Sequence, residues 1–183
     1  MITIKELSLD MLDQIKAFTD SQIGNNYFSI DDLKLVIQHS TSTTGCTSLV
    51  AFEGEKVVAI RLTRNAGSEW HINKKVSPEL WNFDPADIAY FQSVFILPSH
   101  QGKGLGLTLS QAAVSALKKS GAKAVVTHSH VESIGNSSFK YLTKLGFKEV
   151  CSYPDYWKDV DYDCVTCQGN PCKCSAKEMI LHL

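Results

Sequence analysis

The sequence has no long apolar run and no excess of charge of either sign. No stretch approaches the roughly 18 apolar residues that a membrane span needs, and the N-terminal region has no uninterrupted apolar segment typical of a signal peptide. Eighteen Lys and Arg residues against 19 Asp and Glu residues give a formal net charge of -1. We therefore expect a cytoplasmic protein with no membrane partner and no nucleic-acid partner, because the electrostatic basis for binding polyanions is missing.

Proline, tryptophan and methionine are also scarce, with 5, 3 and 3 residues respectively. Apolar residues make up 44% and charged residues 20% of the chain, which are the proportions of a globular domain and exclude a disordered, collagen-like or coiled-coil chain. A length of 183 residues suits one domain with a sizeable core and is short for two. We expect a single domain over residues 1–183.

Hydrophobic periodicity predicts an alternation of strands and helices. Strands are predicted at residues 2–7, 47–52, 56–62, 88–97, 122–127, 147–153 and 176–183, and helices after Ser8, after Ser29, over 103–119 and over 136–145. The strand–helix–strand order after Ile88 makes part of the sheet parallel, and the hairpin at Gly54 makes the whole sheet mixed. The fold class is therefore α/β, with a mixed sheet of about seven strands and about four helices.

A glycine-rich turn joins the predicted strand that ends before Pro98 to the following helix. Backbone N–H groups at a helix N-terminus bind phosphate, and missing Cβ atoms let the ligand approach closely. The Rossmann fingerprint would need glycine at Leu107, and the P-loop would need Ser or Thr directly after Lys103, so neither nucleotide motif fits. We expect an anionic ligand here. The alternative is a turn that only permits tight packing of strand against helix.

The pattern Gln101-x-x-Gly104-x-Gly106 after an apolar strand resembles the acyl-CoA pyrophosphate loop of the GNAT superfamily of N-acetyltransferases. The segment from Asn136 to Phe147, which ends in Lys-Leu-Gly-Phe, is similar to a second helix of that family, and the order of strands and helices is similar too. The resemblance implies a GNAT-like fold and an N-acetyltransferase. Its members transfer an acetyl group from acetyl-CoA to a small-molecule or peptide amine by direct attack in a ternary complex.

The resemblance also implies site residues. The backbone of one strand would bind the pantetheine arm where two parallel strands separate, through Val94, Phe95 and Ile96. The turn would hold the pyrophosphate through Gln101, Gly102, Lys103, Gly104, Leu105, Gly106 and Leu107. The family's CoA-contacting asparagine falls one position from Asn136, which we assign to the cofactor. The tyrosine that protonates the departing thiolate falls one position from Tyr141, which we assign to catalysis.

An attacking amine must lose a proton, so a base with a pKa near neutrality is expected near the strand ends. His128 and His130 alternate on one face after the strand at 122–127, and histidine suits that task. His130 is the candidate base, since it falls at or beside a position where some members of the resembling family place glutamate. Glu132 competes for this role, and a pair of polar caps on a strand end is the plain alternative.

The six cysteines comprise Cys46, Cys151 and one cluster of four. Two pairs of thiols flank the turn-forming sequence Gln-Gly-Asn-Pro, which can fold one pair toward the other. In a reducing compartment clustered cysteines hold metal more often than they form disulfides. We predict a structural Zn²⁺ site in a hairpin insertion at about 160–176, with free thiols, a redox pair or an iron–sulfur cluster as alternatives. The predicted ligands are Cys164, Cys167, Cys172 and Cys174.

The sequence leaves two classes of function. The first is an acetyl-CoA-dependent N-acetyltransferase that acts as a monomer or homodimer. The second is a non-catalytic GNAT-like module in which the zinc-binding hairpin and the Trp-containing segment 65–87 bind a protein partner.

Overall fold

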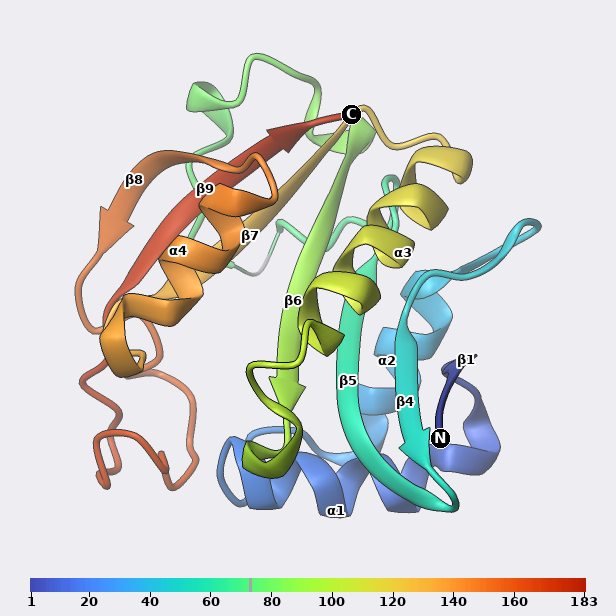
Figure 1. Cartoon of the computed structure of the whole chain (residues 1–183). Coiled ribbons are helices and arrows are strands. Elements are labelled where there is room, and N and C mark those ends of the chain that lie inside the picture. The colour runs from blue at the N-terminus through green and yellow to red at the C-terminus, as the bar shows by residue number, and fades with distance from the viewer. Residues whose placement is uncertain (73) are drawn as a thin grey trace.

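The computed structural model describes residues 1–72 and 74–183, and its main feature is one sheet of seven strands in the order β1-β4-β5-β6-β7-β9-β8 (Figure 1). The strands are β1 (Ile2–Glu6), β4 (Leu49–Glu53), β5 (Lys56–Arg64), β6 (Ile88–Ile96), β7 (Ala124–His130), β8 (Lys148–Tyr153) and β9 (Ala176–His182). The α-helices are α1 (Leu12–Gln22), α2 (Ile30–Ser40), α3 (Leu105–Lys119) and α4 (Ser137–Lys144). The seven-stranded mixed sheet and the four α-helices formed by the described residues confirm the predicted α/β fold.

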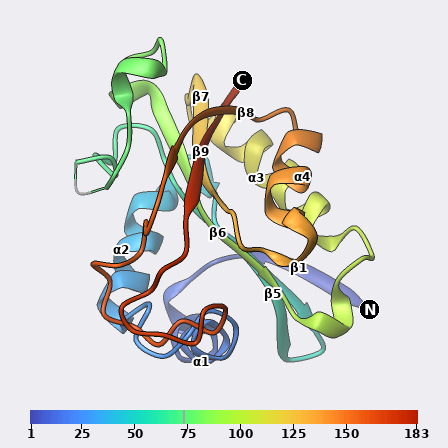
Figure 2. The same ribbon diagram turned by 90° about the vertical axis from the view of Figure 1, so that its left-hand side faces the viewer.

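Helices cover both faces of the sheet. Figure 2 shows α1 and α2 on one side and α3 and α4 on the other. Each side has its own buried cluster, with Leu33 in the first and Leu109 in the second. A third cluster forms around Trp70 and Trp81, where the irregular segment 65–87 packs against β6, β7 and β9. The irregular segment therefore completes the core.

β6 and β7 form the one parallel pair among the described strands. Their pairing begins with Ile88 opposite Ala124 and ends with Phe91 opposite Thr127. Beyond this point β6 continues along β5, with a register shift near Gln92, while β7 continues along β9. The two strands therefore separate and leave a wedge-shaped gap in the sheet (Figure 1).

Local signals set where the helices begin. Ser29 and Asp32 form a capping box at the predicted start of α2, since each backbone N–H donates to the other residue's side chain, at 2.8 and 3.1 Å. α3 begins at Leu105, later than the predicted residue 103, because Gly102 and Gly104 have φ angles of 73° and 81°. A two-residue ladder of β2 (Thr41–Ser42) and β3 (Gly45–Cys46) was not predicted.

None of the helices formed by the described residues combines the length and the apolar character that crossing a membrane requires.

Candidate active site

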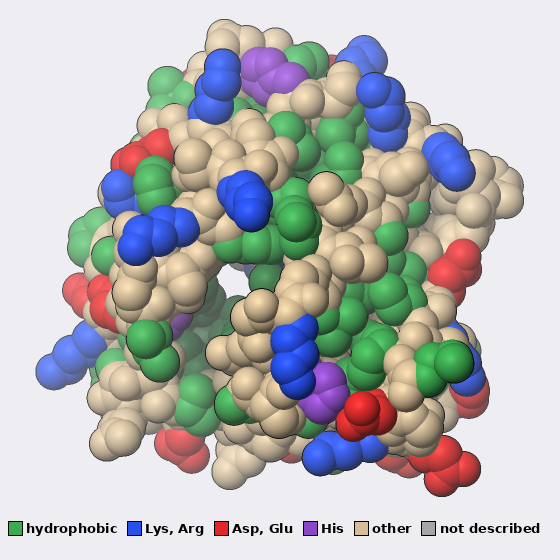
Figure 3. Space-filling view, viewed as in Figure 1, with side chains coloured by type: hydrophobic (Ala, Val, Ile, Leu, Met, Phe, Trp, Pro, Cys, Tyr) green, Lys and Arg blue, Asp and Glu red, His purple; other side chains and the backbone are tan. Residues whose placement is uncertain are grey.

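A cavity of about 140 Å³ lies where β6 and β7 separate. An opening near the middle of the face that carries α3 and α4 marks its position (Figure 3). Its walls come from β5, β6, β7, α4, the end of α1 and the segment that contains the cysteine cluster. Groups from both faces of the sheet therefore meet in one space, and the polar or aromatic ones include Tyr27, Arg61, Ser93, His128, His130, Ser138, Tyr141, Trp157 and Tyr162.

The glycine turn presents bare backbone at the start of α3. No side chain caps this helix, so its first N–H groups have no partner within the helix. A Cβ added to Gly102 or Gly104 would meet no atom within 4 Å, so nothing in the fold requires these residues for packing. Gly106 is different, because a Cβ there would lie 2.7 Å from Cδ1 of Ile96. Tight packing thus explains Gly106, whereas the space around Gly102 and Gly104 is open.

Two side chains fix the shape of this turn. Gln101 donates from Nε2 to the carbonyl oxygen of Ile96 at 2.9 Å, and Lys103 donates from Nζ to the carbonyl oxygen of Ser99 at 2.8 Å. Both residues were predicted to bind the cofactor, and the structure places their side chains in bonds within the loop. The backbone N–H groups from Gly102 to Leu107 are left to face a ligand.

The end of β6 has a free backbone edge at the residues where the pantetheine arm was predicted to bind. Val94, Phe95 and Ile96 pair with β5 on one side only, because β7 has already turned away. Val94 and Phe95 line the cavity. An extended amide chain laid along this edge would meet backbone groups that have no strand partner.

Three residues from different elements meet beneath the cavity. Arg61 of β5 donates from Nε and Nη2 to Ser110 Oγ of α3, at 3.1 and 2.8 Å, and from Nη2 to the phenolic oxygen of Tyr141 of α4 at 2.9 Å. Tyr141 also contacts Ser110 and donates to the carbonyl oxygen of Gly106 at 3.3 Å. Tyr141 therefore reaches the space beside the glycine turn.

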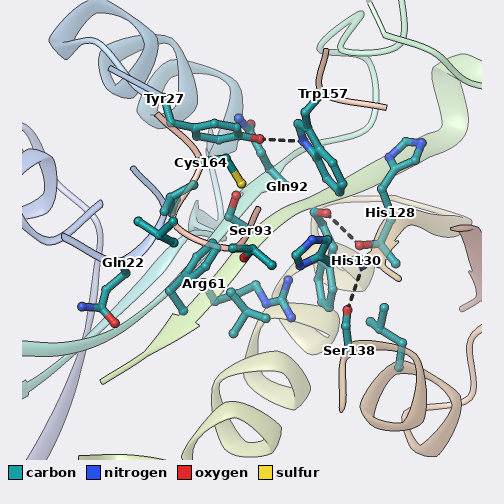
Figure 4. A pocket seen from close by; sticks show the side chains of 18 of the residues that line it. Gln22, Tyr27, Arg61, Gln92, Ser93, His128, His130, Ser138, Trp157 and Cys164 are labelled. Carbon is teal, nitrogen blue, oxygen red and sulfur yellow. Dashed lines mark hydrogen bonds between the residues drawn. The ribbon is translucent and has the colours of Figure 1, made fainter. Parts of the chain in front are cut away.

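His130 is the half-buried histidine that faces the cavity. Its ring and the Arg61 guanidinium both point into the enclosed space, whereas the ring of His128 points away (Figure 4). Burial lowers the pKa of His130, and the nearby Glu132, whose carboxylate lies 3.6 Å from Nε2, opposes this shift. A lowered pKa keeps the imidazole neutral at pH 7, and a neutral imidazole can accept a proton.

His128 is buried, and both of its ring nitrogens have hydrogen-bond partners. Its side chain is 2% exposed, its Nε2 faces the carbonyl oxygen of Lys75 at 3.1 Å, and its Nδ1 accepts from the hydroxyl of Tyr90 at 2.9 Å. The lysine carbonyl can only accept, so Nε2 carries the proton of the neutral ring. Burial lowers the pKa of His128. Both ring nitrogens of His128 are thus engaged within the protein, whereas the ring of His130 faces the cavity.

Glu178 of β9 anchors this buried network. Its carboxylate accepts from Trp81 Nε1 at 2.7 Å, from the Ser77 N–H at 3.1 Å and from the Tyr153 hydroxyl at 3.2 Å. Nε2 of His128 lies 3.7 Å from the same group. Burial alone would raise the pKa of Glu178, but the contacts with His128 and Trp81 lower it below its usual value.

The four clustered cysteines converge, with all four sulfur atoms within 4.8 Å of one another. Sγ of Cys164 lies 4.0 Å from that of Cys174, and Sγ of Cys167 lies 3.8 Å from that of Cys172. A tetrahedral zinc with Zn–S bonds of about 2.3 Å separates its sulfurs by roughly 3.8 Å, whereas a disulfide brings them to about 2.05 Å. The donor set therefore has the spacing of a four-thiolate metal site.

Hydrogen bonds support the charged form of one thiol. Burial would raise the pKa of Cys164, but the backbone N–H of Cys167 and the hydroxyl of Tyr162 outweigh it and lower that pKa to about 6. Tyr162 also donates to Sγ of Cys172 at 3.2 Å. Hydrogen bonds donated to the ligand atoms are typical of metal sites, because they orient the ligands.

The cysteine-bearing segment forms one wall of the cavity. It contributes Cys164, Val165 and Thr166 to the lining, and the Val165 N–H donates to the carbonyl oxygen of Ile23 at 3.3 Å. The sulfur of Cys174, a ring nitrogen of His130 and a carboxylate oxygen of Glu132 also lie within 4.8 Å of one another. The cluster and the candidate base are therefore direct neighbours.

Of the residues predicted to bind the cofactor, Val94 and Phe95 line the cavity, whereas Ile96, the turn residues and Asn136 do not. Asn136 is exposed at the start of α4 with a φ angle of 54°, and it is not among the residues that line the cavity. Sequence reasoning missed Arg61, Ser110 and Glu178. A charged residue inside the apolar run from Val57 to Leu62 was the available signal for Arg61.

The model of the acetyltransferase (GNAT) family matches residues 18–147. The chain belongs to this family. The match includes β6, the glycine turn, α3 and α4. A comparison with curated protein sequences found no match.

Solved structures with the same fold are distant in sequence. The ribosomal-protein-S18-alanine N-acetyltransferase of Escherichia coli is 16% identical, with a TM-score of 0.66 over 100% of this chain and 94% of that one. YncA of Salmonella typhimurium, solved with its cofactor acetyl-CoA, is 19% identical, with a TM-score of 0.67 and coverage of 100% and 94%. Naa50 of Arabidopsis thaliana, in complex with the bisubstrate analogue CoA-Ac-MVNAL, is 13% identical, with a TM-score of 0.65 and coverage of 100% and 99%. These similarities show the GNAT fold.

Proposed function

We propose that this GNAT protein transfers an acetyl group from acetyl-CoA to a primary amine by direct attack. The observation that carries the proposal is a continuous path from the glycine turn to the cavity. The uncapped N-terminus of α3 leads along the free edge of β6 into a cavity where His130 and Tyr141 both lie. An acyl-CoA bound with its pyrophosphate at Gly102 and Gly104 would have its thioester in that cavity.

Acetyl-CoA supplies a thioester carbon that an amine can attack. His130 accepts the proton that the amine loses, since its ring is neutral and faces the cavity. Tyr141 supplies a hydroxyl next to Gly106, in the turn that holds the cofactor. No cysteine nucleophile is needed. The acceptor enters between Tyr27, Trp157 and the cysteine-bearing segment, and it is a small molecule or the end of a peptide.

The cysteine cluster supports a structural zinc site as part of this proposal. Cys164, Cys167, Cys172 and Cys174 hold Zn²⁺, and the metal fixes the segment that forms the acceptor wall. The metal lies at the rim of the cavity and takes no part in the chemistry. It replaces the apolar packing that so short a loop could not supply by itself.

The decisive experiment measures release of CoA thiol from acetyl-CoA over a panel of small amines and peptide N-termini, with calorimetry of acetyl-CoA binding alongside. We expect binding of acetyl-CoA and turnover with at least one amine. Failure to bind acetyl-CoA would refute the proposed acetyltransferase activity and favour the non-catalytic zinc-binding module. Binding without turnover on any amine would leave the module as the better description.

A further inference from the structure

Arg61 is a buried cation without an acidic partner. Its side chain is 1% exposed, and none of the ion pairs among the described residues includes it. A guanidinium stays protonated in proteins, so this is a full charge inside the fold. Breaking or omitting the partner of a buried charge is strongly destabilising. A buried charge that destabilises the free protein indicates a negatively charged or strongly polar ligand group that would pair with it.

The neighbours of Arg61 hold its guanidinium in one orientation. Nε and Nη2 donate to the hydroxyls of Ser110 and Tyr141, and the guanidinium carbon lies 4.0 Å from the centre of the Phe91 ring. Nη1 has no hydrogen-bond partner among the residues that the structure describes. The guanidinium points into the cavity (Figure 4). One strong donor, already oriented, is therefore available to a bound molecule.

The residues that line the cavity limit the kinds of group that Arg61 can bind. No Asp or Glu is among the lining residues, and Arg61 is the sole Lys or Arg among them. The transfer reaction develops negative charge at two atoms in this space, first on the thioester oxygen as the amine adds and then on the sulfur of the departing CoA. We propose that Arg61 is a further catalytic residue that binds the sulfur of CoA through Nη1 as negative charge develops there. This inference rests on the proposed acetyl transfer and adds to it the group that receives the leaving charge.

The step balances with the residues present. The bond between amine nitrogen and carbonyl carbon forms, the carbon–sulfur bond breaks, and the electron pair of that bond goes to sulfur. The amine proton goes to His130. Arg61 neutralises the thiolate without giving up a proton, and Tyr141 orients the guanidinium by accepting a hydrogen bond from Nη2. A preorganised charge in a buried site stabilises such a transition state more than water does.

Replacement of Arg61 by methionine separates this role from a structural one. Methionine fills similar volume without a charge, and Ser110 and Tyr141 already contact each other, so neither hydroxyl is left without a partner. Replacing a buried charge by an apolar side chain is often neutral or stabilising. We therefore expect Arg61→Met to unfold at the same temperature as the wild type or higher. Arg61→Lys keeps the charge and should retain part of the function.

The test compares binding of CoA and of desulfo-CoA, which lacks the sulfur, by calorimetry at pH 8. We expect the wild-type protein to bind CoA at least about tenfold more tightly than desulfo-CoA and to release a proton on binding CoA. In Arg61→Met the two affinities become equal and the proton release disappears. The kcat for acetyl transfer falls about 100-fold with the KM for acetyl-CoA within about threefold, as for loss of one charge-stabilising donor.

Three results would overturn the inference while the proposed function stands. The first is equal affinity of the wild type for CoA and desulfo-CoA. The second is wild-type kcat in Arg61→Met. The third is a preference for an acyl group with a terminal carboxylate, such as succinyl-CoA, that Arg61→Met abolishes, because Arg61 would then bind the acyl group. A wild-type protein that binds neither CoA nor desulfo-CoA refutes the proposed function itself.

Discussion

Gly24 approaches Asp163 so closely that a Cβ on residue 24 would overlap the carbonyl oxygen of Asp163. Its φ angle of 141° also lies in a region that other residues rarely adopt. Gly24 follows α1, and Asp163 precedes the first clustered cysteine. The contact, together with the bond from Trp157 Nε1 to the Tyr27 hydroxyl at 3.1 Å, fastens the cysteine-bearing segment to the end of α1.

Gly24→Ala should therefore displace the acceptor wall. We expect it to lower the free energy of unfolding by roughly 1–3 kcal/mol more than Gly54→Ala does, because overpacking adds to the backbone strain. Gly54 is the matched control, since its φ angle is 61° and a Cβ there meets no atom within 4 Å. Steady-state kinetics should show a raised KM for the amine and an unchanged KM for acetyl-CoA. A change confined to the KM for acetyl-CoA would contradict this assignment.

Gly104→Leu should block cofactor binding. Gly104 has a φ angle of 81° and open space around it, and so does Gly121 at the other end of α3, with a φ angle of 97°. Either substitution costs about 1–2 kcal/mol of backbone strain, so the pair is matched in stability. We expect calorimetry to show at least about tenfold weaker acetyl-CoA binding in Gly104→Leu and little change in Gly121→Leu. Equal effects of the two substitutions would show that the turn is not the phosphate site.

His130→Ala should slow turnover and leave the cofactor bound. General-base catalysis contributes about 100-fold or more, and we propose that backbone groups of the turn and of β6, rather than this ring, hold the cofactor. The control is His100→Ala, because His100 lies outside the cavity and faces Glu53 at 3.4 Å. Single-turnover rates and acetyl-CoA titrations measure the two properties separately. Wild-type turnover in His130→Ala would transfer the role of base to Glu132 or to water.

Glu178→Ala should be among the most destabilising substitutions outside the apolar core. It leaves Trp81 Nε1 and the Ser77 N–H without an acceptor and leaves His128 without its acidic neighbour, which costs about 3–5 kcal/mol. Glu149→Ala is the control, since Glu149 forms a partly exposed ion pair with Lys177 at 2.8 Å that contributes about 0–1 kcal/mol. Denaturant titration of both variants gives the comparison, and similar losses would refute the anchoring role.

The same network sets the pH dependence of stability. The folded-state pKa values of His128 and Glu178 lie below their ordinary values of 6.5 and 4.5, so the unfolded chain binds more protons in acid. Stability is therefore complete above pH 6.5 and falls as the pH drops, first through the range of His128 and then below pH 4.5 through that of Glu178. Unfolding midpoints between pH 3 and pH 8 should show a shallower loss in His128→Gln. A wild-type stability that rises on acidification from pH 7 would contradict the sign.

Removal of the metal should loosen the acceptor wall and spare the cofactor site. Protein purified without added zinc should contain about one equivalent, and Cys172→Ser should contain far less, because a four-thiolate site binds zinc tightly. Cys151→Ser, outside the cluster, should keep the metal. After chelation we expect a lower unfolding temperature and a raised KM for the amine. Less than about half an equivalent of any metal in the wild type would rule the site out.

The order of the elements, the position of the glycine turn and the grouping of four cysteines could be predicted from the sequence. These features are local, since the hydrophobic period sets helices and strands and a few neighbouring residues define a turn or a ligand set. The helix start near residue 103 was misplaced by two positions, because a positive φ at Gly104 delays the first helical residue. The small β2–β3 ladder was missed because four residues have no measurable period.

Only the tertiary structure decided which residues share the cavity. Arg61, Ser110 and Tyr141 come from β5, α3 and α4. They are far apart in the sequence and meet because α3 and α4 pack on the same face of the sheet. His128 and His130 lie two positions apart on one strand, but Glu178 of β9, at the end of the chain, lies next to His128 and leaves His130 facing the cavity. Contacts between distant segments depend on strand order and register, which local preferences do not contain.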